Sequence, residues 1–384
     1  MKPKLRFKQF NSGWNTYKFY DLVTIKNGQV NPNDEQYRNL PHIGPGNIEK
    51  GTGRLLEYNL AKDDKLVSSK YLFDKESVIY GKINPHFAKV CYPKFIGLCS
   101  ADAYPINPIK DKLTPEFLLY LLLNPKFTKF TTSVSMRTGM PKINRDELSI
   151  YKFTIPEIDE QKEIGNMLSL LDRKIELQTK KIEDLKLFKK GLFNNNIDDT
   201  KNIKLSDILT EVSIKSTINN QYEILSSTAN GLYLQKDYFN KQAASENNTG
   251  YKILKRNQLV LSPQNLWMGN ININDKYDIG IVSPSYKIFD IDDNIINIDF
   301  FNNWIKSPRA LYDYMISSEQ GASVVRRNLN IDLFNEIIIK VPERNIQDKI
   351  GKQIKNINMK IELENRKLDK LNDLKKGLMQ NMFV

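Results

Sequence analysis

The sequence is poor in the residues that build disulfide scaffolds and metal centres. Its 384 residues include only two cysteines, Cys91 and Cys99, and two histidines, His42 and His86. No Cys-x-x-Cys pair and no zinc-ligand spacing is present, which excludes a disulfide scaffold and a cysteine-based zinc site and indicates a reducing compartment. The longest apolar run, residues 117–123, is too short to cross a membrane, and no apolar stretch follows the basic start. We therefore expect a soluble, cytoplasmic protein.

Motifs for catalysis are also missing. Residues 84–87 read Asn-Pro-His-Phe, close to the Asn-Pro-Pro-Phe type that holds a target adenine in amino-methyltransferases, but no glycine-rich turn for a methyl donor precedes them. Residues 46–52 have the glycine spacing of a phosphate loop without its lysine, and no Gly-x-Ser-x-Gly elbow occurs. We expect no catalytic residue, no metal site and no cofactor in this chain, and hence a non-enzymatic binding protein.

The charge of the chain is basic and unevenly distributed. The 57 basic and 45 acidic residues give a net charge of +12 and an isoelectric point near 9.3. Residues 1–156 carry 24 basic and 14 acidic side chains, whereas residues 200–342 carry 15 of each. A basic surplus favours a polyanionic partner, either nucleic acid or a membrane surface. The first third is therefore the candidate polyanion-binding domain.

An internal repeat organises the chain. Residues 156–195 and 342–381 are identical at sixteen of forty positions without a gap. Proline and an acidic residue open each copy, as is typical of a helix start. Apolar residues then recur at heptad spacing, which predicts two long helices that bury each other's stripes as a coiled coil. The predicted stripe consists of Ile164, Leu168, Leu171, Ile175, Ile182 and Leu185 in the first copy and Ile350, Ile354, Ile357, Ile361, Leu368 and Leu371 in the second.

The parts between the repeated helices mix strands and short helices. Residues 77–80, 258–261 and 278–282 are typical of strands, and residues 114–123 and 300–307 of helices. Residues 96–100 resemble residues 279–283, so we predict that both parts share one fold with divergent loops. The prediction is an α+β (mixed α/β) chain with two similar globular domains, residues 1–156 and 198–342, and two helical segments, residues 157–197 and 343–384.

This plan resembles the specificity subunit of type I restriction-modification systems. The resemblance rests on Pro156, Gln161 and Gly165 and on Lys-Lys-Gly-Leu at residues 189–192. Both motifs return in register in the second copy, within residues 342–351 and 375–378. One departure is that Ile346 stands where the first copy has Glu160. From the family pattern we expect this change to weaken helix capping or a partner contact in the second copy.

The resemblance implies both function and partners. Each globular domain would be a target recognition domain that reads one half of a bipartite, asymmetric site in double-stranded DNA. The two helices would form an antiparallel coiled coil, related by a pseudo-two-fold repeat, that sets the unread spacer and docks two modification subunits. Two restriction subunits would join through these. S-adenosylmethionine, ATP and Mg²⁺ would be bound by the partner subunits, where the target adenines are flipped out.

Candidate DNA-contacting residues lie in loops of both globular parts. Arginine and lysine suit guanine edges, asparagine and glutamine suit adenine, and cations contact phosphates. In the first domain the candidates are Lys82, Asn84, His86, Lys89, Arg137 and Lys142; in the second they are Gln264, Asn265, Arg326 and Arg327. Two other functions fit less well. A coiled-coil scaffold joining two protein-binding modules needs no basic domain, and a fused restriction-modification enzyme needs catalytic domains for which this chain is too short.

Overall fold

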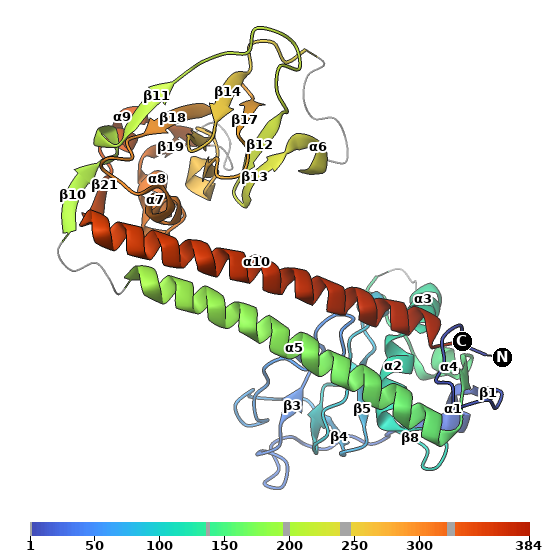
Figure 1. Ribbon diagram of the computed structural model, residues 1–384. Coiled ribbons are helices and arrows are strands. Elements are labelled where there is room, and N and C mark those ends of the chain that lie inside the picture. Colours follow the sequence, from blue (N-terminus) through green and yellow to red (C-terminus); the bar gives the residue numbers. More distant parts are fainter. Residues whose placement is uncertain (1, 136–138, 195–199, 239–246, 321–326) are drawn as a thin grey trace. The chain divides into compact units, whose positions relative to one another are not determined.

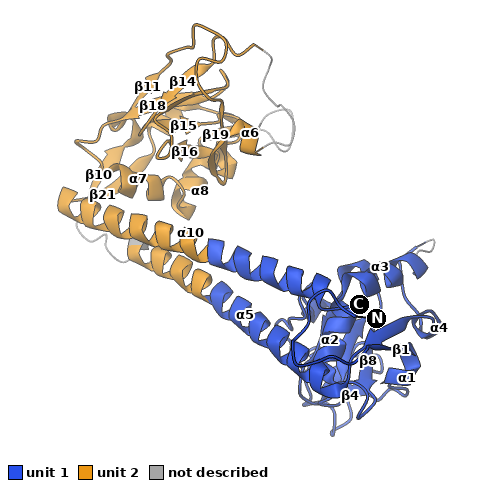
Figure 2. Cartoon of the chain, turned by 45° about the vertical axis from the view of Figure 1, so that its right-hand side comes forward, with its two compact units in different colours: residues 1–180, 366–384 blue, residues 181–365 orange. Residues whose placement is uncertain are grey.

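The computed structural model describes residues 2–135, 139–194, 200–238, 247–320 and 327–384. The chain divides into two compact units, which are coloured separately in Figure 2. Unit 1 comprises Met1–Lys180 and Arg366–Val384, and unit 2 comprises Lys181–Asn365. Each unit therefore contains one globular part and a portion of each of the two long helices, which are labelled α5 and α10 in Figure 1.

Unit 1 is built around a four-stranded antiparallel sheet in the order β2-β8-β5-β6. A smaller sheet, in the order β3-β7-β4, and the pair β1–β9 complete its strands. Its elements are β1 (Asn15–Lys18), α1 (Phe19–Leu22), β2 (Val23–Ile25), β3 (His42–Ile43), η1 (Pro45–Asn47), β4 (Tyr71–Phe73), β5 (Val78–Gly81), η2 (Pro85–Phe87), β6 (Val90–Cys91), β7 (Gly97–Cys99), β8 (Ala103–Pro108), α2 (Pro115–Leu123), α3 (Pro125–Val134), α4 (Arg145–Ser149), β9 (Lys152–Ile155) and the first part of α5 (Ile158–Asn194).

Unit 2 repeats this topology. Its four-stranded sheet has the order β11-β18-β15-β16, and the pairs β10–β21 and β14–β17 match β1–β9 and β4–β7 of unit 1. The prediction of one fold used twice is confirmed. Its elements are β10 (Thr200–Lys204), η3 (Leu205–Asp207), β11 (Leu209–Val212), β12 (Leu225–Thr228), β13 (Gly231–Leu234), α6 (Gln235–Tyr238), β14 (Lys252–Lys255), β15 (Leu259–Leu261), η4 (Leu266–Met268), β16 (Ile271–Ile273), β17 (Ile279–Val282), β18 (Lys287–Ile291), α7 (Ile298–Trp304), α8 (Pro308–Ile316), β19 (Ser318–Gln320), β20 (Arg327–Leu329), α9 (Ile331–Asn335), β21 (Ile338–Pro342) and the first part of α10 (Arg344–Asn381).

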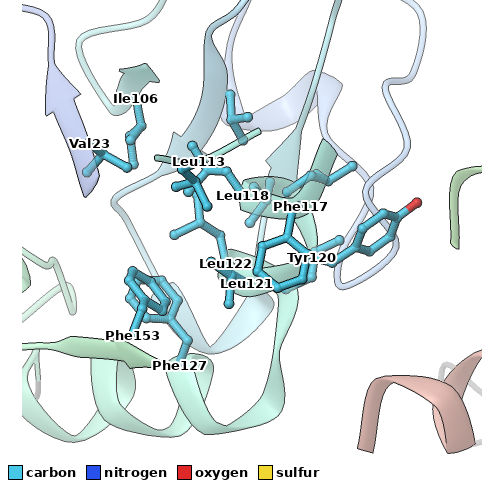
Figure 3. Packing of buried hydrophobic residues seen from close by; sticks show 14 of the residues in the cluster. Val23, Ile106, Leu113, Phe117, Leu118, Tyr120, Leu121, Leu122, Phe127 and Phe153 are labelled. Carbon is cyan, nitrogen blue, oxygen red and sulfur yellow. The ribbon is translucent and has the colours of Figure 1, made fainter. Parts of the chain in front are cut away.

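The main core of unit 1 lies between the four-stranded sheet and helices α2 and α3 (Figure 3). Helix α2 begins as the sequence predicts, with Thr114 capping its first turn through the Phe117 amide and Pro115 in the first helical position. Its residues from Phe117 to Leu123 are all buried, because the helix is covered on every side. In unit 2, Phe300, Phe301 and Trp304 of α7 form the corresponding core against the sheet.

A glutamine and a glycine attach each long helix to its own globular part. The Gln161 amide donates to the carbonyls of Lys112 and Pro156, both at 2.9 Å, and its oxygen accepts from the Thr114 amide at 3.1 Å. Four residues later, a Cβ added to Gly165 would lie 2.9 Å from the Glu116 Cβ, closer than side chains tolerate. The start of α5 thus packs against the start of α2 at a distance that only glycine allows.

The second copy repeats this attachment. The Gln347 oxygen accepts from the Asn297 amide at 2.7 Å, and its amide donates to the Pro342 carbonyl at 2.9 Å. A Cβ on Gly351 would lie 2.7 Å from Asn297 Oδ1. The motif shared by the two copies therefore has a structural role in both halves.

Within each unit, helices α5 and α10 lie side by side and antiparallel, as Figure 1 shows and as the resemblance implied. In unit 1, Lys375 Nζ lies 2.6 Å from Asp172 Oδ1 and donates to the Thr52 carbonyl, while the Tyr120 hydroxyl donates to Asp172 Oδ2 at 2.8 Å. In unit 2, Lys181 Nζ lies 2.9 Å from Oε1 of Glu364, whose side chain is buried.

The predicted apolar stripe divides between two environments. Its first two members in each helix, Ile164 with Leu168 and Ile350 with Ile354, are buried in the cores of their own globular parts. The remaining members lie further along the paired helices. Leu171, Ile182 and Ile357 are buried there, whereas Ile175, Leu185, Ile361, Leu368 and Leu371 are half-buried.

The substitution of Ile346 for Glu160 has a packing explanation. Both oxygens of the fully buried Glu160 carboxylate accept from the Arg6 guanidinium, at 2.7 Å each. Arg6 precedes the first strand of unit 1, and Ile346 packs instead against the apolar core of unit 2. The second copy thus has a half-buried apolar side chain where the first buries a paired carboxylate.

Two successive residues of α5 give a matched test of this packing. Leu171 is 7% exposed and Leu170 is 66% exposed. We expect Leu171→Asp to lower the free energy of unfolding by about 3 kcal/mol, since it removes a buried apolar side chain and places a carboxylate among apolar neighbours. Leu170→Asp should change it by no more than about 0.5 kcal/mol. Urea unfolding followed by circular dichroism measures both, and equal losses would contradict the burial of this stripe.

Candidate nucleic-acid interface

The two predicted DNA-contacting segments of the first half come together in unit 1. The loop after β5 carries Lys82 and Asn84, and Asn84 adopts a left-handed backbone with φ of 50°. The Asn84 amide donates to the Pro141 carbonyl at 2.8 Å, and Ile83 forms an isolated bridge with Lys142. Two segments that are far apart in the sequence therefore share one surface.

A cluster of basic side chains surrounds Tyr104 on this surface. Lys82 Nζ lies 5.3 Å from the Tyr104 ring centroid, and Arg145 Cζ lies 5.5 Å from it. Burial first, and the positive charge of Lys142 second, lower the pKa of Lys82. Lys142 itself is exposed. The charge of this cluster suits it to binding an anion.

The short helix η2 contributes a second group of basic and aromatic residues. His86 is exposed and its ring centroid lies 4.1 Å from that of Phe87, over which Lys50 Nζ lies at 3.7 Å. Lys89 points elsewhere, because its ammonium donates to the Pro45 carbonyl, and burial lowers its pKa. Of the predicted residues in this turn, His86 is therefore the one open to solvent.

The corresponding loop of unit 2 also meets the segment predicted with it. Gln264 and Asn265 follow β15 as Ile83 and Asn84 follow β5, and the Arg327 amide donates to the Gln264 carbonyl at 3.4 Å. Gln264 is exposed and Asn265 is half-buried. The structure thus brings together Gln264, Asn265 and Arg327, while Arg137 and Arg326 lie outside the described residues.

Arg327 is held in place by an aromatic ring. Its Cζ lies 5.7 Å from the Trp267 ring centroid, and its Nη1 donates to the Met315 carbonyl at 3.1 Å. An arginine held by an indole ring and a carbonyl in this way is already ordered before a ligand binds. The exposed Met268 follows Trp267 at the tip of η4.

Sequence reasoning missed several residues of these surfaces. Tyr104, Arg145, Lys50 and Trp267 were not among the candidates. Arg145 is the first residue of α4, and Tyr104 lies in a strand, so neither belongs to a basic loop. The signal that could have found Arg145 is the Asn144–Glu147 capping box, which places it directly beside the predicted Lys142 segment.

Comparisons of sequence identify the relatives of this chain. Residues 11–187 match the family model for the type I restriction modification DNA specificity domain. The EcoDI specificity subunit of Escherichia coli is 35% identical over 153 residues, which is 40% of this chain and 33% of that protein. The putative MjaX specificity subunit of Methanocaldococcus jannaschii is 31% identical over 218 residues, which is 53% of this chain and 51% of that protein. The matches thus span about one third to one half of these relatives.

Solved structures share the fold over the whole chain. The type I restriction-modification S subunit from M. genitalium has 17% sequence identity and a TM-score of 0.63, covering 100% of this chain and 99% of that one. A chain from a study of complex assembly and conformational transition of the type I R-M system has 12% identity and a TM-score of 0.52, covering 98% of both. At these identities the likeness concerns the fold.

Lys306 supports the η4 turn and gives a pH-dependent prediction. Its ammonium donates to the carbonyls of Gly269 at 2.8 Å and Ala229 at 3.2 Å, and burial lowers its pKa to about 8. Between pH 8 and pH 10.5 the unfolded chain therefore retains a proton that the folded chain has lost. Within that window the contribution of Lys306 to the free energy of unfolding rises with pH. Below pH 8 this contribution does not change with pH.

We expect Lys306→Met to remove this rise. The measurement is the difference in free energy of unfolding between the wild-type chain and Lys306→Met at about pH 7.5 and about pH 9.5, with exposed Lys340→Met as the control. Lys340→Met should follow the wild-type profile. Parallel profiles for the wild type and Lys306→Met would show that the Lys306 ammonium is not held at a lowered pKa.

Proposed function

This chain is related to the specificity subunits of type I restriction-modification systems, and we propose that it supplies DNA sequence recognition to such a complex. In this proposal each globular part reads one half of a bipartite, asymmetric site in double-stranded DNA. The chain itself carries out no catalysis and acts in the cytoplasm. In the described part of the chain, no helix has the length and apolar character to span a membrane, and no three potential ligands gather as a metal site.

The observation that carries the proposal is a pair of matched loops with different side chains. Both loops leave the central strand of their sheet, β5 or β15, enter a single short turn, and contact the segment that precedes the last strand before a long helix. The fold is repeated, but the loops carry Lys82 and Ile83 in one unit where the other carries Pro263 and Gln264. A repeated frame with unlike loops is what reading two different half-sites requires.

The two units would divide the work of binding. The first carries the basic surplus and the cluster around Tyr104, which suits contacts with the phosphate backbone. The second is neutral and exposes Gln264 beside the ordered guanidinium of Arg327. Glutamine and asparagine amides pair with adenine edges, and arginine pairs with guanine. Base identity in the second half-site would therefore depend on this loop.

The long helices carry exposed apolar residues at positions related by the repeat. Leu177 and Leu374 belong to unit 1, and their counterparts in the other copy of the repeat, Leu363 and Phe188, belong to unit 2. All four are at least 52% exposed. Two equivalent apolar surfaces suit two copies of one partner, which we take to be the modification subunits. Two restriction subunits would then join through them.

The helices would also set the length of the unread spacer. Helix α5 has 37 residues and α10 has 38, so each is about 55 Å long at about 1.5 Å per residue. S-adenosylmethionine, ATP and Mg²⁺ belong, in this proposal, to the modification and restriction subunits. The target adenine would be flipped into the modification subunit.

Mapping methylated adenines tests the reading of DNA. DNA from cells that express this chain with its modification subunit should carry methyladenine in one bipartite sequence. We expect Gln264→Ala or Asn265→Ala to relax the bases accepted in one half-site, with about 1–3 kcal/mol of discrimination lost for each bidentate contact. The other half-site and the spacing should not change. Methylation without any sequence preference would refute the proposed function. So would the finding that the chain joins proteins and binds no DNA.

A second prediction concerns the modification subunits. We expect Leu177→Asp to weaken docking at the unit 1 surface and Leu363→Asp to weaken it at the unit 2 surface, so that each variant binds one modification subunit instead of two. Light scattering on a sizing column gives the mass of each complex. The control is Asn358→Asp, an exposed position five residues before Leu363 and therefore on a different side of the helix. If all three variants bound two subunits, the apolar pairs would not be the docking surfaces.

A further inference from the structure

Three cationic side chains from separate segments converge beside Tyr104 in unit 1. Lys82 follows β5, Lys142 lies in the segment before α4, and Arg145 begins α4. The Ile83–Lys142 bridge and the hydrogen bond from the Asn84 amide to the Pro141 carbonyl hold the first two segments together. The Tyr104 hydroxyl donates to the Ile143 carbonyl at 3.4 Å, which fixes the ring between Lys82 and the start of α4.

The charge of this cluster is not neutralised within the described residues. Lys82 is 9% exposed as a whole residue, but its ammonium is not fully buried, and no acceptor in the described ranges lies within hydrogen-bonding or ion-pair distance of it. Asp102 attracts Lys82 electrostatically, but Lys142 and Arg145 repel it. Holding a partly buried cation beside two others is unfavourable unless an anion joins them. The arrangement thus fits a ligand that supplies negative charge.

We propose that Lys82, Lys142 and Arg145 form one site that binds a single phosphate of the DNA backbone. This inference rests on the proposed function and assigns a specific task to this surface. Lys142, which is exposed, would meet the phosphate first. Lys82 and Arg145, which both lie near the Tyr104 ring, would add positive charge on the protein side of the bound phosphate.

The geometry favours a phosphate over a base edge. Reading guanine requires a free arginine fork, but Arg145 uses Nη1 to donate to Asn27 Oδ1 and Nη2 to donate to the Lys26 carbonyl at 2.8 Å. Its guanidinium therefore acts as a fixed positive charge. Lysine ammoniums are point charges that tolerate any direction of approach, which suits phosphate oxygens.

Unit 2 does not repeat the site. By the alignment of β15 with β5, Pro263 takes the place of Lys82, and the paired strand places Lys287 where unit 1 has Tyr104. Lys287 is neutralised there, because its ammonium contacts both oxygens of the Glu211 carboxylate. The phosphate site is thus a property of the first unit and not of the shared fold.

Salt titrations of DNA binding test the site in the chain assembled with its modification subunits. The variants are Lys82→Met, Lys142→Met and the double variant, and the control is Lys110→Met, an exposed lysine beyond the other end of β8. Each single variant should weaken binding to a cognate duplex and a half-site-scrambled duplex by the same factor. Because both lysines neutralise one phosphate, the double variant should lower the salt slope by about 0.9, and not by about 1.8.

A slope change of about 0.9 means that the affinity lost between about 50 mM and about 200 mM salt is about 3.5-fold smaller in the double variant. A scan with single neutral methylphosphonate linkages locates the contact. One linkage should weaken the wild-type assembly and leave the double variant unaffected. Lys82→Arg, which keeps the charge, should retain the wild-type slope and shows whether Lys82→Met acts through charge or through folding.

Each alternative result has a defined meaning. A double variant that matches Lys110→Met would overturn the site, and so would a slope loss of about 1.8, which indicates two separate phosphates. A loss confined to the cognate duplex would show that these residues read bases. If the wild-type assembly bound no duplex at all, the proposed function would fail and this inference with it. If the wild-type assembly bound DNA and the variants bound it with the same salt dependence, the proposed function would stand and the site would not.

Discussion

The close packing of each long helix on its own globular part is the constraint from which the rest of the architecture follows. A Cβ on Gly165 would lie 2.9 Å from Glu116, and one on Gly351 would lie 2.7 Å from Asn297, so neither helix can approach as it does with any larger residue. Gln161 and Gln347 add hydrogen bonds at the same places. Each helix therefore leaves its globular part in a direction fixed by local contacts, and its apolar stripe beyond that point is free to pair with the other helix.

The two units hold the start of their long helices through different contacts. Unit 1 contains both chain ends: the Leu5 amide donates to the Asn381 carbonyl at 2.8 Å, and Phe383 stacks on Phe117 with ring centroids 5.3 Å apart. The bidentate Arg6–Glu160 pair joins the N-terminal segment to the same region. Breaking a buried pair by removing one partner leaves an uncompensated charge, so these contacts depend on one another. Unit 2 replaces the pair with Ile346 and needs no added segment.

The parts of the fold that the sequence predicts are those encoded by local patterns. A heptad stripe that occurs twice in the chain indicates two long helices, and Thr114-Pro115 marks the start of α2. The basic cluster could not be predicted, because it depends on contacts between distant segments. Arg145 reaches Asn27 and the Lys26 carbonyl, which lie in a distant part of the sequence. Lys89 belongs to a basic loop, yet its ammonium is bound by Pro45 inside unit 1. Sequence position shows which residues are cationic but not which of them face solvent.

The separation of frame from loops has a consequence for how recognition can change. The cores of both units are formed by the central sheet and the helices that follow it, and neither Lys82 nor Pro263 belongs to the apolar clusters. Substitution of an exposed loop residue such as Gln264 alters hydrogen-bonding groups without creating a cavity in the core, so its cost in stability is small. The contacts that attach the helices involve other residues, Gln161 and Gly165 or Gln347 and Gly351. Loop chemistry can therefore change in one unit while the helices, and any partner that docks on them, remain as they are.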